Sequence, residues 1–229
     1  MTRKHGRLTL EEQILEKNLY LTSKEYAVLL HLTGNRAVTG FAIDFPTDTA
    51  EKRKILFGLY RKGIVCNTGS EFKVADEWRE VFRSIQTAQK VLWMTFEEEE
   101  QPDLLFYVCS DNAVCIENLT DTEHDCYRIS MRENAVWRND LIERELFPNI
   151  RTDLSLGELL DRGLGVEDSS TPETVVTFSM YQNGADTRTE KVSLEKENLI
   201  YYVKYEAADG VTRKRAHKTE IEEILKKYL

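Results

Sequence analysis

Proline, glycine and long apolar runs are all scarce in this sequence of 229 residues. Four prolines and eleven glycines argue against long linkers. No apolar run approaches the roughly 20 residues that a membrane helix needs, and the basic N-terminal stretch lacks the apolar core of a signal peptide. Because 41% of the residues are hydrophobic and 31% are charged, we expect a globular cytoplasmic protein that makes no membrane contact.

Cysteine pairs at metal-binding or redox spacing are also absent, since none of the four cysteines lies in a CxxC motif, and we expect reduced thiols. Cys109, Cys115, His124 and Cys126 form the only metal-like set, and thiolates with an imidazole would suit zinc. Their spacing does not fit a zinc knuckle, however, and Cys109 and Cys115 fall inside apolar strand-like runs. We therefore favour buried structural cysteines, with no metal and no cofactor.

Catalytic motifs are missing as well. The sequence contains no HExxH, GxSxG, Walker A or GxGxxG pattern. The four histidines stand outside any motif: His5, His31, His124 and His217. Carboxylates are numerous, but spacing alone brings none of them together in space. A reaction is therefore unsupported, and we expect a protein that is not an enzyme.

Charge is plentiful but unevenly distributed. Residues 1–90 hold 15 Lys/Arg against 11 Asp/Glu, a balance of +4, whereas residues 91–229 hold 16 against 29, a balance of −13. A weakly basic head thus precedes a strongly acidic body. The body should repel nucleic acid at long range, but the head need not.

The head, residues 1–90, shows a pattern that is typical of a winged helix. Thr22 with Glu25 and Asp48 with Glu51 have the spacing of helix N-caps, and Gly63 is a natural helix end. The expected elements are helices from Leu10 to about Leu19, after Thr22, after Asp48 and from Asp76, with a hairpin of strands 64–67 and 71–75.

The sequence of the body, residues 91–229, predicts an antiparallel sheet in which the same order of strands and helix occurs twice. Two sets of about four strands are expected, each followed by a helix, which indicates an α+β protein with two pseudo-symmetric halves, 91–150 and 151–229. The first four strand-like runs are VLWMTFEE, DLLFYVCSD, NAVCIENLT and CYRISMRE, followed by a helix over Trp137–Leu146. The second four begin at TVVTFSMYQNG, TRTEKVSLEKE, NLIYYVKYEA and VTRKRAH, followed by a C-terminal helix with Ile221, Ile224, Leu225 and Tyr228 facing inward.

Two charged stretches are candidate binding sites. Lys52, Arg53 and Lys54 lie on the third expected helix and would contact DNA phosphates, but solvated charges beside a core face explain them more simply. The run Glu97, Glu98, Glu99 and Glu100 would bind a basic partner, but it also fits a solvated turn that protects a strand end from edge pairing.

A tyrosine-rich strand offers a third candidate. Tyr201, Val203 and Tyr205 share one face of this strand, while Tyr202 and Lys204 share the other. An aromatic sheet face is usually core. The opposite face, if it is uncovered, is a candidate interface.

The order of elements resembles that of the EspG family, cytosolic chaperones of bacterial type VII (ESX) secretion. The segments that carry the likeness are GIVCNTGSEFKVADEWREVF, SDNAVCIENL and YEAADGVTRKRAHKTEIEEIL. The resemblance covers most of the chain at the level of pattern. It implies a pseudo-two-fold α+β body that grips the tip of a helical secretion substrate, and it implies no catalysis. No motif position matches closely enough to carry binding residues over.

Two functions therefore compete. The first is a non-catalytic cytoplasmic chaperone or adaptor whose partner is a helical secreted protein. An exposed sheet face or inter-strand loop would hold this partner and shield its apolar residues. The alternative is a winged-helix transcriptional regulator, with DNA on the head and a ligand-binding or dimerising acidic body.

Overall fold

A computed structural model describes residues 18–34, 39–41, 43, 45–98, 101–119, 126–143, 171–185, 187–197, 200–207 and 210–229. The head contains β1 (Leu19–Leu21), α2 (Ser23–Leu32), α3 (Thr49–Arg61), β2 (Val65–Asn67), β3 (Phe72–Val74) and α4 (Asp76–Thr87). The body begins with β4 (Lys90–Phe96), β5 (Leu104–Val108), β6 (Asn112–Asn118), β7 (Tyr127–Glu133) and α5 (Asn134–Glu143). It continues with β8 (Glu173–Gln182), β9 (Arg188–Glu197), β10 (Ile200–Ala207), β11 (Gly210–Arg215) and α7 (Lys218–Tyr228).

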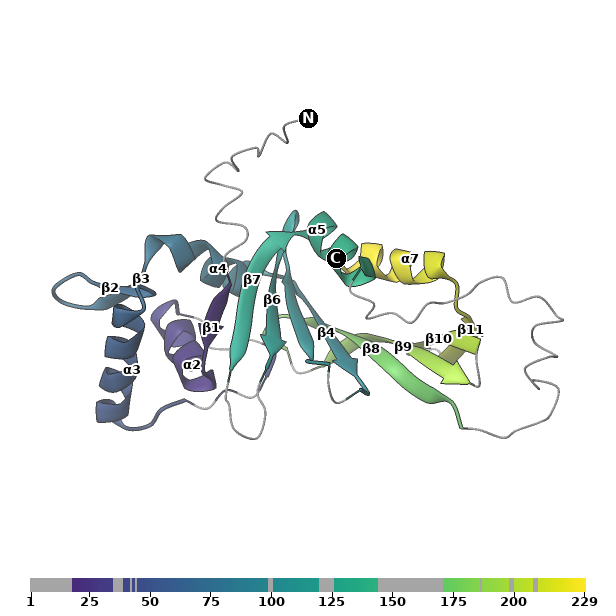
Figure 1. The fold of residues 1–229 in the computed structure, drawn as a ribbon, viewed down its shortest axis with the longest axis horizontal. Helices are drawn as coiled ribbons and strands as arrows, with labels where there is room; N and C mark the ends of the chain where they lie inside the picture. Colours follow the sequence, from purple (N-terminus) through teal and green to yellow (C-terminus); the bar gives the residue numbers. More distant parts are fainter. Residues whose placement is uncertain are drawn as a thin grey trace, which may run out of the picture.

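One antiparallel sheet runs through the whole body (Figure 1). Its nine strands have the order β1-β7-β6-β5-β4-β8-β9-β10-β11, and a separate two-stranded sheet joins β2 to β3. Together with the described helices, this sheet confirms the predicted α+β class. No helix in the described part of the chain is both long and apolar enough to cross a membrane.

The two sets of four strands meet at the centre of the sheet. β4 pairs with β5 on one side and with β8 on the other, so that the two sets of four strands extend in opposite directions from this pair. In the described part of the chain each set is followed by a helix, α5 or α7, as the repeat in the sequence predicted. The helices α5 and α7 also contact each other.

These two helices cover one face of the sheet (Figure 1). Phe106 of β5 is fully buried there, with its ring edge against Trp137 of α5 at a centroid distance of 5.4 Å. The four inward positions predicted for the C-terminal helix are all buried in the same core. Alternate residues of β4, β5, β6, β8, β9 and β10 also contribute to this core.

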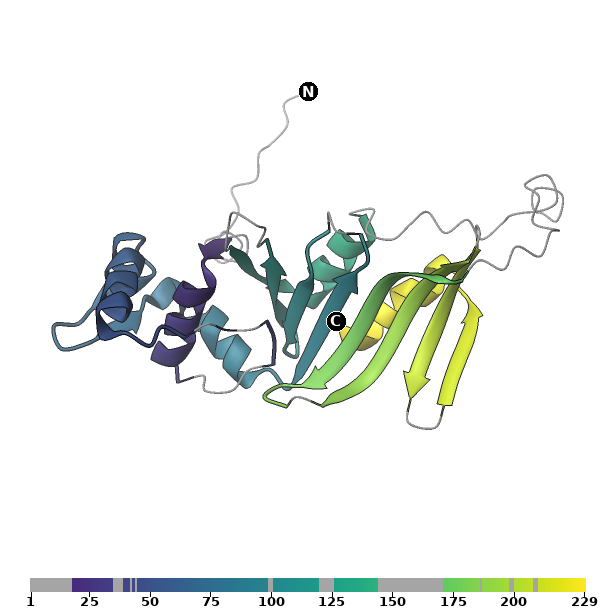
Figure 2. The ribbon, with the colours of Figure 1, turned by 90° about the horizontal axis from the view of Figure 1, so that it is seen from below.

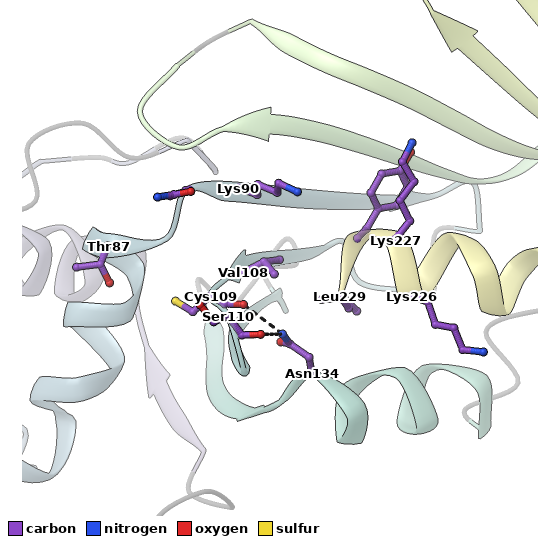
Figure 3. Close-up of a pocket in the computed structure, with 11 residues that line it drawn as sticks. Thr87, Lys90, Val108, Cys109, Ser110, Asn134, Lys226, Lys227 and Leu229 are labelled. Carbon is purple, nitrogen blue, oxygen red and sulfur yellow. Dashed lines mark hydrogen bonds between the residues drawn. The ribbon is translucent and has the colours of Figure 1, made fainter.

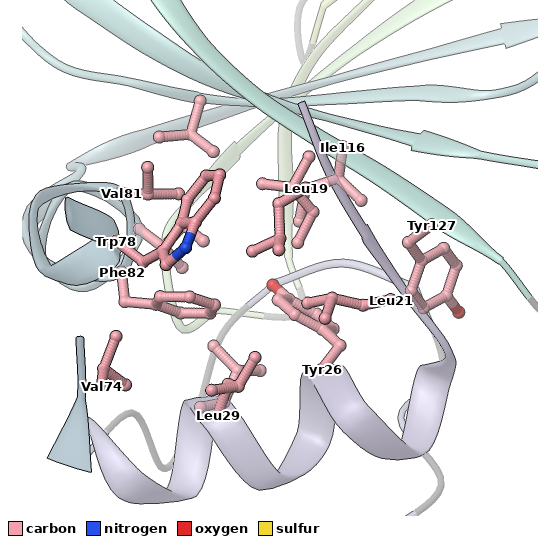
Figure 4. Close-up of a cluster of buried hydrophobic side chains, with 14 of the residues drawn as sticks. Leu19, Leu21, Tyr26, Leu29, Val74, Trp78, Val81, Phe82, Ile116 and Tyr127 are labelled. Atoms are coloured by element: carbon pink, nitrogen blue, oxygen red, sulfur yellow. The ribbon is translucent and has the colours of Figure 1, made fainter. Parts of the chain in front are cut away.

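The head packs on the opposite face, over β4 to β7 (Figure 4). Its core lies between α2, α4 and the sheet, where Phe82 and Leu29 have no exposed surface. The strand β1 adds to the sheet edge by pairing with β7. The predicted apolar stripe of α4 is buried in this core: Trp78, Val81, Phe82 and Ile85.

The helix caps form as the sequence predicts. The Thr22 hydroxyl accepts the Glu25 backbone N–H at 3.1 Å, and the Glu25 carboxylate accepts the Thr22 N–H at 3.0 Å. The Asp48 carboxylate accepts two backbone N–H groups in the first turn of α3. Gly63 follows α3 with a φ of 74°, a left-handed conformation that glycine adopts without strain.

Two helix boundaries differ from the prediction. Leu19, the expected end of the first helix, begins β1 because β7 offers it a pairing partner; residues 10–17 lie outside the described part of the chain. α5 begins at Asn134 rather than Trp137, since the Asn134 side chain donates to the carbonyls of Cys109 and Ser110 and fixes the first turn against the β5–β6 turn. The winged-helix fold of the head and the divisions at residues 90 and 150 stay predictions.

A polar joint connects the head to the second half of the sheet. Asn183, in the β8–β9 turn, donates its side-chain amide to the carbonyls of Ile85 at 2.8 Å and Ala88 at 3.0 Å. The Thr39 hydroxyl accepts the Gly184 N–H at 3.1 Å in the same turn. These bonds satisfy backbone groups where α4 ends and thereby fix the head against the sheet.

Candidate functional site

The second half of the sheet, β8 to β11, has one covered and one uncovered face. Tyr201, Val203 and Tyr205 belong to the core beneath α7, as the alternation in β10 predicted. Tyr202 and Lys204 point to the other face, over which the described part of the chain places no helix. Figure 2 shows this open face in front of α7. Within the described residues this face is uncovered, and it stays the candidate interface that the sequence predicted.

One part of the open face centres on Arg213 of β11. Its guanidinium binds the carboxylates of Glu195 at 3.0 Å and Glu197 at 2.8 Å. It also lies over the Tyr202 ring, 3.9 Å from the centroid. Burial alone would lower the pKa of Arg213, but the two carboxylates outweigh it and raise that pKa. The ring and the cation thus form one rigid contact surface.

A second group of charges lies beside it and centres on Lys204. The Lys204 ammonium lies 3.2 Å from Glu206 and 3.5 Å from Glu195. Lys191 reaches Glu206 at 3.3 Å. Burial alone would raise the pKa of Glu206, but the hydrogen bonds from Lys204 and Lys191 lower it. Glu195 and Glu206 are therefore each shared between two or more cations, Glu197 pairs with Arg213, and the face as a whole is polar rather than apolar.

The inner boundary of the open face is aromatic. Trp93 of β4 and Tyr181 of β8 lie with ring centroids 6.3 Å apart, and Phe41 packs edge-on against Trp93 at 5.4 Å. Between this boundary and Lys204 the strands carry small hydroxyl side chains, with Thr177 and Ser193 3.4 Å apart. A partner docked here would meet aromatic rings near the head and paired charges further out.

The charged stretches singled out in the sequence lie elsewhere. Glu97 and Glu98 are exposed just after β4, where Glu98 accepts a hydrogen bond from Gln101 at 3.0 Å; Glu99 and Glu100 lie outside the described residues. Lys52, Arg53 and Lys54 are exposed on α3, at the opposite end of the molecule from β11 (Figures 1 and 2). The fold therefore places Lys52, Arg53 and Lys54 far from the open face.

The metal-like set gives no centre among the residues that the structure describes. Cys115 is buried, Cys109 and Cys126 are half-buried, and His124 falls in a range that is not described. Cys109 lines a cavity of about 480 Å³ between the ends of α4 and α7 and the start of α5 (Figure 3). Burial raises the pKa of the Cys109 thiol, which is the opposite of what an activated nucleophile needs.

The open face could be found in the sequence only in part. The alternation in IYYVKYEA indicates one apolar and one polar face, and that signal is correct. The partners of Tyr202 are not encoded locally, because Arg213 and Glu195 reach it from two neighbouring strands. Cross-strand register decides these contacts.

Comparison with known proteins gives a likeness of fold. A search of protein-family profiles finds no match, and a search of curated proteins finds none either. Among solved structures, the chain is similar to the type VII secretion system chaperone EspG5 of Mycobacterium tuberculosis, solved in complex with the PE25–PPE41 dimer. The identity is 12% and the TM-score is 0.57, over 93% of this chain and 95% of that one. At this identity the likeness shows the fold alone.

Proposed function

We propose that this protein is a non-catalytic cytoplasmic chaperone or adaptor that binds a helical secreted protein of a type VII-like secretion system. One observation carries the proposal: nearly the full length of the chain superposes on nearly the full length of EspG5, a chaperone that was solved bound to a PE–PPE dimer. Because the match extends over 93% of this chain, it rests on the fold as a whole rather than on one common motif.

The open face of β8 to β11 is the surface that we assign to the client. It is polar, so the client would be held through hydrogen bonds and exchanged ion pairs, with the aromatic boundary at Trp93 and Tyr181 receiving its apolar residues. This refines the mechanism expected from the sequence, in which the sheet face mainly shields apolar surface. Shielding would be confined to the edge near the head.

Co-expression tests the proposal. The tagged protein is produced with small helical secreted proteins encoded beside its gene, and the purified complex is weighed by light scattering. We expect a complex with a single client in a fixed ratio. A protein that stays unbound with every neighbouring candidate would contradict the proposal.

Charge reversal then tests the surface. Lys204→Glu and Arg213→Glu should weaken client binding, because each turns a shared cation into a further carboxylate among Glu195, Glu197 and Glu206. Lys226→Glu makes the same charge change at an exposed position of α7, on the covered side of the sheet, and serves as the matched control. Equal losses in all three variants would remove the open face as the client site. The alternative, a DNA-binding regulator, stays a prediction that salt-dependent duplex binding would favour.

A further inference from the structure

The outer face of α3 differs from the surfaces of the other helices that the structure describes, because it exposes aromatic rings. Phe57 retains 57% of its surface and Tyr60 retains 50%, in a helix whose only fully buried residue is Leu59. Both rings are braced from one side by Phe72 of β3, with centroid distances of 5.8 Å to Phe57 and 6.3 Å to Tyr60. The contacts with Phe72 therefore restrict the side-chain conformations of both rings and keep them exposed.

Cations surround these rings. At 100° per residue, Arg53, Lys54 and Arg61 lie within about 60° of Phe57 on the helix surface, and all three are exposed. None of the three forms an ion pair with another residue in the part of the chain that the structure describes. We call this surface, made of Arg53, Lys54, Phe57, Tyr60 and Arg61, the α3 outer face.

The inner flank of the same helix behaves differently. There Glu51 binds Lys24 of α2 at 2.7 Å, and Lys62, directly after α3, binds Glu25 at 2.6 Å. The charges that face the head are thus paired within the protein, whereas the outer cations lie around exposed rings. The exposed rings and the outer cations are therefore available to contact apolar and acidic side chains of another molecule.

We propose that the α3 outer face is a second docking surface, and that its occupant is an acidic amphipathic helix of a partner protein. An apolar row flanked by carboxylates is the complement of two rings flanked by three cations. Aromatic residues and arginine are the side chains most enriched in such interfaces. The surface is small, so a single short helix suits it better than a whole domain.

Duplex DNA fits this surface less well. A phosphate backbone offers no partner to an exposed phenylalanine at the centre of the helix face, and it requires cations that continue along a track. Beyond the α3 outer face the cations do not continue as a track, because Asp48 caps α3, Glu71 pairs with Lys73 and Asp76 pairs with Arg79. Charge complementarity therefore favours an acidic protein segment.

The α3 outer face lies at the other end of the molecule from β8 to β11 (Figures 1 and 2). A helix bound there would leave the open face of the sheet accessible. The inference consequently stands apart from the proposed function: loss of one binding activity need not affect the other.

Peptide binding by the full-length protein tests the inference. The probe is a fluorescent, roughly 16-residue peptide that repeats leucine and glutamate at helical spacing, and the control peptide carries lysine in place of glutamate. We expect the acidic peptide alone to raise fluorescence anisotropy, with an affinity that falls as salt rises. Phe57→Ser, and separately the double variant Arg53→Glu/Arg61→Glu, should each weaken binding about tenfold or more.

Arg83→Glu provides the matched control, because Arg83 is an exposed cation of the same head on α4. It should bind the acidic peptide as the unchanged protein does. Because Phe57 is largely exposed, Phe57→Ser should keep the melting temperature of the unchanged protein, which circular dichroism checks. Lys204→Glu should leave peptide binding intact, which separates this test from that of the client surface.

Four outcomes would overturn the inference. They are no binding of the acidic peptide, equal weakening by Arg83→Glu, tighter binding of a DNA duplex or a thymidine oligonucleotide that the same α3 variants abolish, and self-association in sedimentation that Phe57→Ser abolishes. The third would assign the face to nucleic acid, and the fourth would assign it to a second copy of this chain.

Discussion

The two halves of the sheet have the same order of elements but different surroundings. β4 to β7 are covered on one face by α5 and on the other by the head, whereas the described residues cover β8 to β10 on one face only and leave β11 exposed. The sequence reflects this difference. β5, LLFYV, and the centre of β6, AVCIE, are buried at nearly every position, while β11 is exposed throughout. In the described part of the chain, the first half is thus buried on both faces, whereas the second half leaves one face uncovered.

The largest test of this comparison is the loss of a core ring from the first half. Phe106→Ala removes a fully buried ring that packs on Trp137, and it should lower the free energy of unfolding by about 3–5 kcal/mol. Tyr202→Ala removes a ring of similar size from the open face and should cost far less. Urea denaturation of both variants measures the difference. Similar losses would contradict the assignment of β8 to β11 as the half with a free face.

The second largest loss of stability is expected at the joint between the head and the second half of the sheet. Asn183→Ala removes two hydrogen bonds to the carbonyls of Ile85 and Ala88, and it should destabilise the protein by about 1–3 kcal/mol. Gln182→Ala, at the exposed neighbouring position, is the control and should have little effect. Hydrogen exchange at the end of α4 should increase only in the Asn183 variant, and unchanged exchange there would argue against a joint.

A smaller effect is expected within the open face itself. A double-mutant cycle of Tyr202→Ala and Arg213→Ala should give a coupling of about 0.5–1 kcal/mol, typical of an exposed cation over a ring. The four proteins of the cycle are compared by urea denaturation. Zero coupling would mean that the stacked geometry is not maintained in solution.

The smallest effect is a dependence of stability on pH. The pKa of Glu206 is lower in the folded protein than in the unfolded chain, so its ionised form stabilises the fold above the unfolded pKa, and this contribution is lost as pH falls through the folded pKa. The free energy of unfolding of Glu206→Gln should therefore lie below that of the unchanged protein at pH 7, and the two should converge in acid. Exposure keeps the difference small. A gap that widens in acid would contradict this sign.

Glu190 offers a matched comparison on the covered side. Its hydrogen bond from Lys227 lowers its pKa despite burial, and Tyr228 also donates to it, at 2.8 Å. Glu190→Gln should consequently show the same convergence in acid. If the loss of unfolding free energy shrinks in acid for one substitution and grows for the other, the two carboxylates do not respond to pH in the same way.

Much of the fold could be predicted because the signals are local. The Thr22 and Asp48 caps, the turn at Gly63 and the alternation in β10 each depend on a few neighbouring residues, and all are confirmed. The candidate site was predictable only as a polar strand face. The exposed rings of α3 were missed, since helical spacing places Tyr60 in an apolar stripe and does not show that the head stops short of covering it.

The sequence by itself determined the order of most helices and strands and the uneven charge of head and body, although it did not predict β1 or the start of α5 at Asn134. Tertiary structure alone decided that β1 joins β7, that β4 pairs with β8, and that the described part of the head packs mainly on β4 to β7. Helix caps and strand alternation arise from interactions within a few residues, so they can be read along the chain. Strand partners and uncovered faces depend on contacts between segments that lie far apart in sequence, and no local pattern specifies those contacts.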